Sequence, residues 1–161
     1  MLKSPKIKPT FSHILLKKQV QDCCFRVWKL GPTALVKILS ENKRNIGWYV
    51  RNPNHAAFIK NHHHNPNYLS STELKTKQLN ISSDIDQVVS QADVLIIAIP
   101  SAFLSKTLEK LSLPLDDKII FSAVKGVVPE SMMIVGEHFQ KKHRVPIEKI
   151  GVICGPSHAE E

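Results

Sequence analysis

The chain has 161 residues, three cysteines and a formal net charge of +8. This length is enough for one good hydrophobic core, and no apolar run approaches the roughly 18 residues that a membrane-spanning helix needs. Two of the cysteines, Cys23 and Cys24, are adjacent, which is not the spacing of a disulfide framework. We therefore expect a protein of the reducing cytoplasm that does not associate with membranes.

The positive charge is concentrated near the N-terminus. Residues 1–31 contain seven basic side chains and one acidic one, whereas the remaining residues contain 15 basic and 13 acidic ones. A nearly neutral body argues against a nucleic-acid partner. A basic module that uses residues 1–31 to contact nucleic acid stays open as an alternative of another class.

The predicted elements alternate between helix and strand after residue 32. Residues 1–31 show no clear period, and residues 17–29 have neither a helix face nor a strand face. Helices are expected over residues 33–42, 54–61, 85–91, 101–111 and 131–142, and strands over residues 46–50, around residue 81, and over 93–100, 118–124 and 150–154. Residues 62–78 are expected to form a loop. This alternation predicts an α/β fold with a doubly wound, mostly parallel sheet.

Residues 93–100 are the clearest strand. Their six consecutive apolar residues predict burial on both faces, as in a parallel sheet, and Pro100 ends the strand because it has no N–H to donate. Apolar spacing further predicts that the helix over 33–42 buries Leu35, Ile38 and Leu39. The same reasoning predicts that the helix over 131–142 buries Met132, Val135 and Phe139.

Ligands of such sheets bind just past the carboxyl ends of the strands, so residues at these ends are candidates for a site. Arg51 follows the strand over 46–50, where an acid would bond a ribose 2′-hydroxyl and an arginine accommodates a 2′-phosphate. Lys125 follows the strand over 118–124 and can pair with a phosphate or polarise a carbonyl. For both residues, the alternative is a solvated charge at the end of a strand.

Two further groups have weaker signals. Residues 155–159 (Gly-Pro-Ser-His-Ala) follow the last expected strand and offer free N–H groups and a hydroxyl to an oxyanion or phosphate, or form a plain tight turn. The run of histidines over 62–64, with His55 nearby, lacks a cysteine or carboxylate at ligand spacing. We therefore expect a solvated loop there and no metal site.

Several segments fall together in the order and spacing of one family. They are residues 33–35 (Thr-Ala-Leu), 48–52 (Trp-Tyr-Val-Arg-Asn), 67–69 (Asn-Tyr-Leu), 92–94 (Ala-Asp-Val), 98–101 (Ala-Ile-Pro-Ser), 122–126 (Ser-Ala-Val-Lys-Gly) and 155–161 (Gly-Pro-Ser-His-Ala-Glu-Glu). Over residues 32–161 the chain resembles the bacterial NAD(P)-dependent glycerol-3-phosphate dehydrogenases. Another dehydrogenase of the same architecture, acting on a hydroxy acid or sugar acid, is the second interpretation.

The resemblance implies a Rossmann-like domain of a cytoplasmic oxidoreductase that interconverts dihydroxyacetone phosphate and sn-glycerol 3-phosphate for phospholipid synthesis, with NAD or NADP as cofactor. It places Arg51, Tyr68, Lys125 and Ala159 on the cofactor, and Lys125, Gly155 and Ser157 on the small-molecule substrate. No metal, nucleic acid or membrane is implied, and a full-length member would be expected to form a homodimer.

Two departures from the family lead us to expect a fragment that is inactive as given. In the family, the catalytic lysine and a helical second domain come after the Gly-Pro-Ser-His motif, where this chain stops. The first strand and its glycine fingerprint should also precede Thr33, but residues 25–31 contain a single glycine. One glycine cannot supply the turn and the close backbone approach that a pyrophosphate needs.

The unusual composition of residues 1–31 suggests a segment translated out of frame, followed by a partial NAD(P)-binding domain over 32–161. Codons can be chosen for residues 19–31 so that dropping the first base gives Arg-Tyr-Lys-Ile-Ala-Val-Ser-Gly-Tyr-Gly-Ser-Trp-Gly. This is a short apolar strand followed by the pattern G-x-G-x-x-G. We accordingly expect a doubly wound sheet whose first strand is poorly ordered or improvised.

Overall fold

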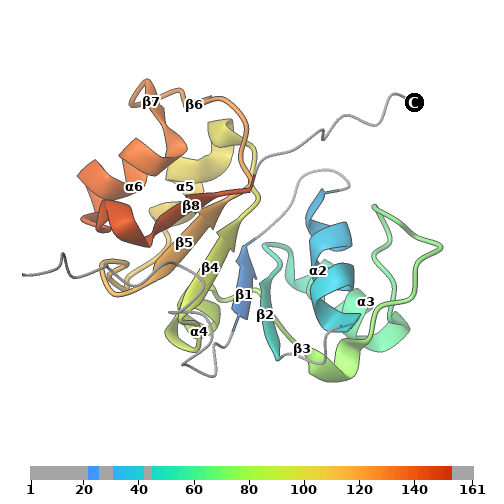
Figure 1. The fold of residues 1–161 in the computed structure, drawn as a ribbon. Coiled ribbons are helices and arrows are strands. Elements are labelled where there is room, and N and C mark those ends of the chain that lie inside the picture. The colour runs from blue at the N-terminus through green and yellow to red at the C-terminus, as the bar shows by residue number, and fades with distance from the viewer. Residues whose placement is uncertain (1–21, 26–30, 42–44, 154–161) are drawn as a thin grey trace, which may run out of the picture.

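The computed structural model describes residues 22–25, 31–41 and 45–153. Strands and helices alternate along the chain, which confirms the α/β class (Figure 1). The elements are β1 (Asp22–Phe25), α2 (Gly31–Glu41), β2 (Ile46–Tyr49), α3 (Pro53–His62), β3 (Leu79–Ser82), α4 (Ile85–Ser90), β4 (Val94–Ile97), α5 (Leu104–Leu108), β5 (Ile119–Ser122), β6 (Val127–Val128), β7 (Met133–Ile134), α6 (Val135–His143) and β8 (Ile150–Val152), with short 3-10 helices η1 (Thr76–Gln78), η2 (Ser101–Phe103) and η3 (Ile147–Lys149).

Six strands form one sheet in the order β3-β2-β1-β4-β5-β8. Every pairing in this sheet is parallel. The chain first runs outward from β1 to β3 and then returns to β4 on the other side of β1, so the order reverses between β1 and β4. This is the strand order of the doubly wound dinucleotide-binding fold, and it confirms the predicted sheet.

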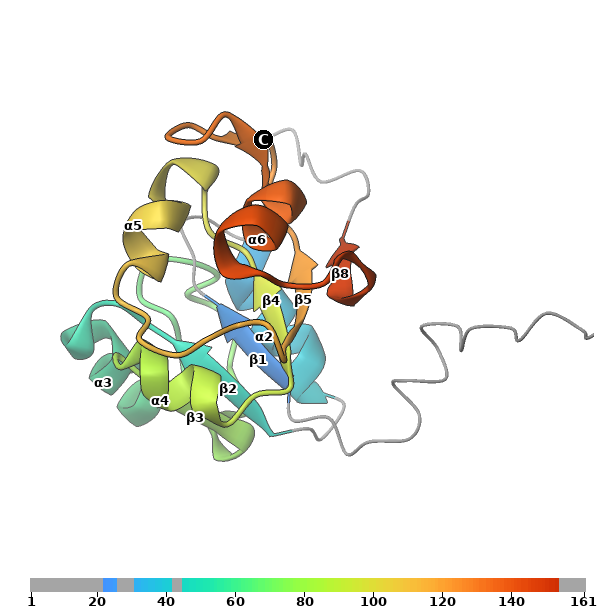
Figure 2. The same ribbon diagram turned by 90° about the vertical axis from the view of Figure 1, so that its left-hand side faces the viewer.

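Each face of the sheet packs against its own set of helices, because successive residues of a strand point to opposite faces. On one face, Trp48 of β2 and Ile96 of β4 pack with residues of α2 and α3. On the other face, Leu95 and Ile97 of β4 pack with residues of α4, α5 and α6 (Figure 2). The strand predicted over residues 93–100 is observed over Val94–Ile97, and its burial on both faces is confirmed, since all four residues of β4 are buried.

The interpretation that residues 17–29 lack a strand was wrong for Asp22–Phe25. These residues form β1 at the centre of the sheet, paired with β2 on one side and β4 on the other. Their residue types give no strand signal, so the position is determined by the backbone groups of the two neighbouring strands, which need a partner. The improvised first strand expected from the sequence is therefore this segment.

The prediction of a helix over residues 131–142 was wrong at its start. Val127–Val128 pairs antiparallel with Met133–Ile134, and α6 begins only at Val135. Met132 lies in the connecting turn with a φ of 53° and is 77% exposed, whereas Val135 and Phe139 are buried as predicted. Pro129, directly after β6, favours this turn over an early helix start.

Two other helices differ from the predicted pattern. Residues 101–111 start as the 3-10 helix η2, and α5 covers only Leu104–Leu108. In α2, Val36 is fully buried while Ile38, which was expected to be buried, is 60% exposed. The remaining predicted elements lie within a few residues of the observed ones, and in the described residues no helix is long and apolar enough to cross a membrane.

Phe139 and Met132 provide a matched test of this packing, because the sequence pattern placed both on one helix face. Phe139→Ala should lower the free energy of unfolding by about 3–5 kcal/mol, since it leaves a cavity in the core. Met132→Ala should change it by less than about 0.5 kcal/mol, as for an exposed residue. Urea unfolding followed by circular dichroism measures both, and equal losses would contradict the observed start of α6.

Candidate functional site

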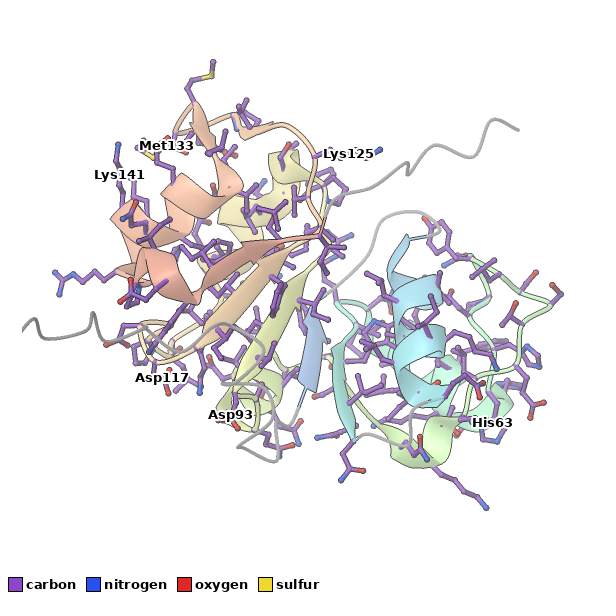
Figure 3. All side chains as sticks on the ribbon, viewed as in Figure 1. His63, Asp93, Asp117, Lys125, Met133 and Lys141 are labelled. Atoms are coloured by element: carbon purple, nitrogen blue, oxygen red, sulfur yellow. The ribbon has the colours of Figure 1, made fainter. Side chains whose placement is uncertain are left out.

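The carboxyl ends of the parallel strands meet at one edge of the sheet, which is where this fold binds its ligands. The crevice is expected at the reversal of strand order, between the ends of β1 and β4. Lys125 lies at this edge, whereas Asp93 and Asp117 precede β4 and β5 and lie at the opposite edge (Figure 3). The candidate site is therefore built from the segments that follow the strands.

Lys125 lies where the sequence predicted it, three residues after the end of β5. The backbone there is fixed, because Ala123 N–H donates to the Ile97 carbonyl (2.8 Å) and Ile153 N–H donates to the Ser122 carbonyl (2.8 Å). These bonds tie the ends of β4, β5 and β8 together. The side chain of Lys125 itself is exposed at this edge.

Gly126 turns the chain immediately after Lys125. Its φ of 82° is in the left-handed region, which a glycine adopts without strain. A Cβ placed on Gly126 would lie 3.9 Å from Ser101 Oγ. Ser101 follows β4 as the first residue of η2, so the segment after β4 and the segment after β5 approach each other at the candidate site.

Arg51 lies between the end of β2 and the start of α3. Val50 N–H donates to the Ser82 carbonyl (2.8 Å), which joins the ends of β2 and β3. The Asn52 side chain caps α3 by accepting from the N–H groups of Asn54 (2.9 Å) and His55 (3.3 Å). Arg51 is exposed between these two fixed points, next to the central strand, at the position where this fold contacts a nucleotide ribose.

Tyr68 belongs to the loop that connects α3 to η1, and it is half-buried against the core cluster under α2 and α3. The loop is attached to α2 at its far end, where Lys37 Nζ donates to the Glu73 carbonyl (2.8 Å). Lys75 forms an ion pair with Glu41 at the end of α2. Hydrogen bonds from Lys75 and Lys37 lower the pKa of the Glu41 carboxyl.

Asn65 fixes the near end of the same loop, and the sequence analysis did not identify it. Its side-chain nitrogen donates to Thr33 Oγ1 (2.9 Å), and its side-chain oxygen accepts from Asn67 N–H (3.0 Å). Asn65 is 6% exposed and Thr33 is fully buried in the first turn of α2. Asn65 thus holds the turn before Tyr68 against the start of α2. The dipeptide Asn65-Pro66 is a turn signal that could have indicated it.

The other predicted site residues lie outside the described part of the chain. Gly155, Ser157 and Ala159 belong to the segment over 154–161, and the residues between β1 and α2 belong to the segment over 26–30. The predicted contacts of these residues with substrate and cofactor therefore remain predictions.

The histidines of the loop interact with neighbouring side chains. The ring of His62 stacks on Phe58 with 4.1 Å between ring centroids. His63 Nδ1 contacts Thr76 Oγ1, and His55 Nδ1 lies 3.4 Å from the side-chain nitrogen of Asn67. Among the described residues, no group of three or more histidine, cysteine or acidic side chains could hold a metal ion.

A cavity of about 460 Å³ lies between α5, the β6–β7 hairpin and α6, and none of the predicted site residues that the structure describes lines it. His138 is 5% exposed at its wall, where Ser131 Oγ lies 3.2 Å from His138 Nδ1. The ring of His143 lies 5.6 Å from that of His138, centroid to centroid. Burial lowers the pKa of both histidines, so both favour the neutral form.

Comparison with known families and structures gives a consistent result. Residues 31–161 match the protein family described as "NAD-dependent glycerol-3-phosphate dehydrogenase N-terminus". Among curated proteins, the glycerol-3-phosphate dehydrogenase (NAD(P)+) of Lysinibacillus sphaericus is 33% identical over 133 residues, which is 80% of this chain and 38% of that protein. The protein of the same name from Macrococcus caseolyticus is 31% identical over 131 residues, with 80% and 39% of the two chains covered.

Solved structures support the fold. The glycerol-3-phosphate dehydrogenase of Coxiella burnetii superposes with a TM-score of 0.71 at 16% identity, over 88% of this chain and 42% of that one. The enzyme from Saccharomyces cerevisiae gives a TM-score of 0.67 at 17% identity, over 84% and 41% of the two chains. The chain therefore spans about two fifths of the length of the proteins it matches.

The Asn65 contact can be tested against an exposed amide pair. Asn65→Ala leaves the buried Thr33 hydroxyl without this donor and should lower the free energy of unfolding by about 1–3 kcal/mol. Asn80→Ala removes a hydrogen bond from exposed Asn80 to Gln91 (2.7 Å) and should cost less than about 0.5 kcal/mol. Urea unfolding measures both costs. Faster amide exchange at Asn67 in Asn65→Ala alone would confirm the local release, and equal costs would contradict the positioning role.

The buried histidines predict a pH dependence. Because the pKa values of His138 and His143 are lowered in the folded state, the unfolded chain binds more protons as the pH falls through 6.5. Stability should therefore be full above pH 6.5 and fall between that pH and the lowered folded-state values. The free energy of unfolding should be measured at pH 7.5 and at pH 5.5. Its decrease between the two should be smaller in the double variant His138→Gln/His143→Gln than in the unsubstituted chain. An equal decrease in the double variant would show that other titratable groups cause the loss of stability and would contradict this prediction.

Proposed function

Because the chain belongs to the family of the NAD-dependent glycerol-3-phosphate dehydrogenase N-terminus, we propose that it is the nucleotide-binding part of an NAD(P)-dependent oxidoreductase. The reaction proposed for the whole protein interconverts dihydroxyacetone phosphate and sn-glycerol 3-phosphate, in phospholipid precursor synthesis. The observation that carries the proposal is the placement of Arg51 and Lys125 after β2 and β5 of a sheet with dinucleotide-binding order. A cytoplasmic location is part of the same proposal.

The cofactor side of the site is proposed to use Arg51 and Tyr68, with Ala159 from the C-terminal segment. Arg51 follows the strand next to β1, where an arginine can pair with the 2′-phosphate of NADP. Tyr68 lies in the loop that Asn65 ties to the first turn of α2. This tie supports a cofactor role for Tyr68, because the start of α2 is where the pyrophosphate of a dinucleotide binds.

The substrate side is proposed to use Lys125, with Gly155 and Ser157 from the C-terminal segment. A lysine ammonium is a compact charge that attracts a phosphate and can polarise a carbonyl oxygen. The bonds that tie the ends of β4, β5 and β8 support this role, since they hold the Lys125 segment beside the segment that leads to Gly155.

The residues before α2 do not fit a dinucleotide. Residues 26–31 are Arg-Val-Trp-Lys-Leu-Gly, and the single glycine cannot provide both the tight turn and the close approach that a pyrophosphate requires. The residues at the ends of β2, β4 and β5 therefore suit NAD(P), but the chain lacks the phosphate-binding loop that the cofactor needs. We expect the chain as given to be inactive and derive no hydride-transfer step for it.

Restoring the loop tests the nucleotide-binding proposal. A variant with Ser-Gly-Tyr-Gly-Ser-Trp-Gly in place of residues 25–31 should bind NADPH with a Kd of about 1 µM to 1 mM, measured by nucleotide fluorescence. The chain as given, and a control variant with alanine at each introduced glycine, should not bind in this range. Failure of the restored variant would contradict the proposed function, and tight binding by the chain as given would contradict the damaged-loop interpretation.

In the restored variant, Arg51→Ala should separate the two cofactors. If Arg51 pairs with the 2′-phosphate, the substitution weakens NADPH binding about tenfold, or about 1.4 kcal/mol, and leaves NADH binding nearly unchanged. Lys106→Ala, which removes an exposed charge from α5, is the control and should affect neither cofactor. An equal loss of affinity for NADPH and NADH would contradict the pairing of Arg51 with the 2′-phosphate.

A further inference from the structure

The position of β1 constrains how residues 22–31 arose. Asp22 pairs with Ile46 and Val94, Cys23 with Gly47 and Leu95, and Cys24 with Trp48 and Ile96. This segment thus fills the position of the first strand of the dinucleotide-binding fold, in register with both neighbours. The family match, in contrast, begins only at residue 31.

The residue types of β1 disagree with this position. All four residues of β2 and all four of β4 are buried, as expected for central strands of a parallel sheet covered on both faces. β1 lies between them but has the sequence Asp-Cys-Cys-Phe. Aspartate is depleted from β-strands, so its residue type does not suit this position.

The length of the segment agrees with the fold. β1 ends at Phe25 and α2 begins at Gly31, so the strand, connection and helix start have the spacing that G-x-G-x-x-G occupies between a first strand and its helix. The spacing is therefore retained while the residue types are altered. A change of reading frame has this effect, because it alters the residues and keeps their number.

We propose that residues 22–31 are the family's first strand and phosphate-binding loop, translated from a shifted reading frame. The proposal rests on the proposed function, and at four positions the genetic code supports it whatever codons are used. A cysteine codon followed by T yields alanine or valine when read one base later, which applies to Cys23 and Cys24 because the codons after them begin with T. Asp22 becomes isoleucine or threonine, and Trp28 before Lys29 can only become glycine.

In the shifted frame the aspartate and both cysteines of β1 are therefore replaced whatever codons are used. The first three residues of the shifted segment are isoleucine or threonine followed by two residues that are each valine or alanine, so none is charged, and β-branched codon outcomes suit a central strand covered on both faces. A glycine follows in the connection. Suitable codons at Arg26 and Gly31 complete the pattern G-x-G-x-x-G. Both the strand and its loop would then come from one change of frame.

The nucleotide sequence tests the proposal directly. We expect codons that give glycine at positions 26 and 31 when residues 22–31 are read one base later. Codons that give another residue at both positions would overturn it.

A stability measurement tests the strand separately from cofactor binding. The triple variant Asp22→Ile/Cys23→Ala/Cys24→Val of the full chain should raise the urea midpoint by about 1 M, since it puts the shifted-frame residues into β1. Asp117→Ile, at an exposed aspartate outside the sheet, is the control and should not raise it. No gain in the triple variant would overturn the inference. A gain without NADPH binding by the loop-restored variant would contradict the proposed function instead.

Discussion

The pairing of β1 with both of its neighbours is the interaction on which the rest of this structure depends. Without it the sheet would be two parts, β3–β2 on one side and β4–β5–β8 on the other. Each part would expose the unpaired backbone groups of a buried strand, which is costly. β1 pairs with β2 over three residues and with β4 over four, so a segment with a poor strand sequence is ordered by its two neighbours.

The same strand defines the candidate site. The order of strands reverses beside β1, and the ends of β2, β4 and β5 bring Arg51, Ser101 and Lys125 to one edge of the sheet. Hydrogen bonds between strand ends, and the buried bond between Asn65 and Thr33, hold the surrounding segments. The scaffold of a dinucleotide site is therefore present, while the residues after β1 lack the glycines that a pyrophosphate requires.

Where the fold could be predicted from the sequence, the signal was local and strong. The apolar run in residues 93–100 identified β4, and the ends of two strands located Arg51 and Lys125. Where prediction failed, non-local interactions decided the structure. β1 is ordered by its neighbours, and the contact between Asn65 and Thr33 joins residues 32 positions apart. The hairpin before α6 was missed because Met132, Val135 and Phe139 also have helical spacing.

Amide hydrogen exchange in the chain as given tests the central role of β1 most directly. If β1 is paired on both sides, the amides of residues 23–25 should exchange as slowly as those of residues 95–97, their partners in β4. Exchange of residues 23–25 at the rate of an unfolded peptide, with β4 still protected, would contradict the account.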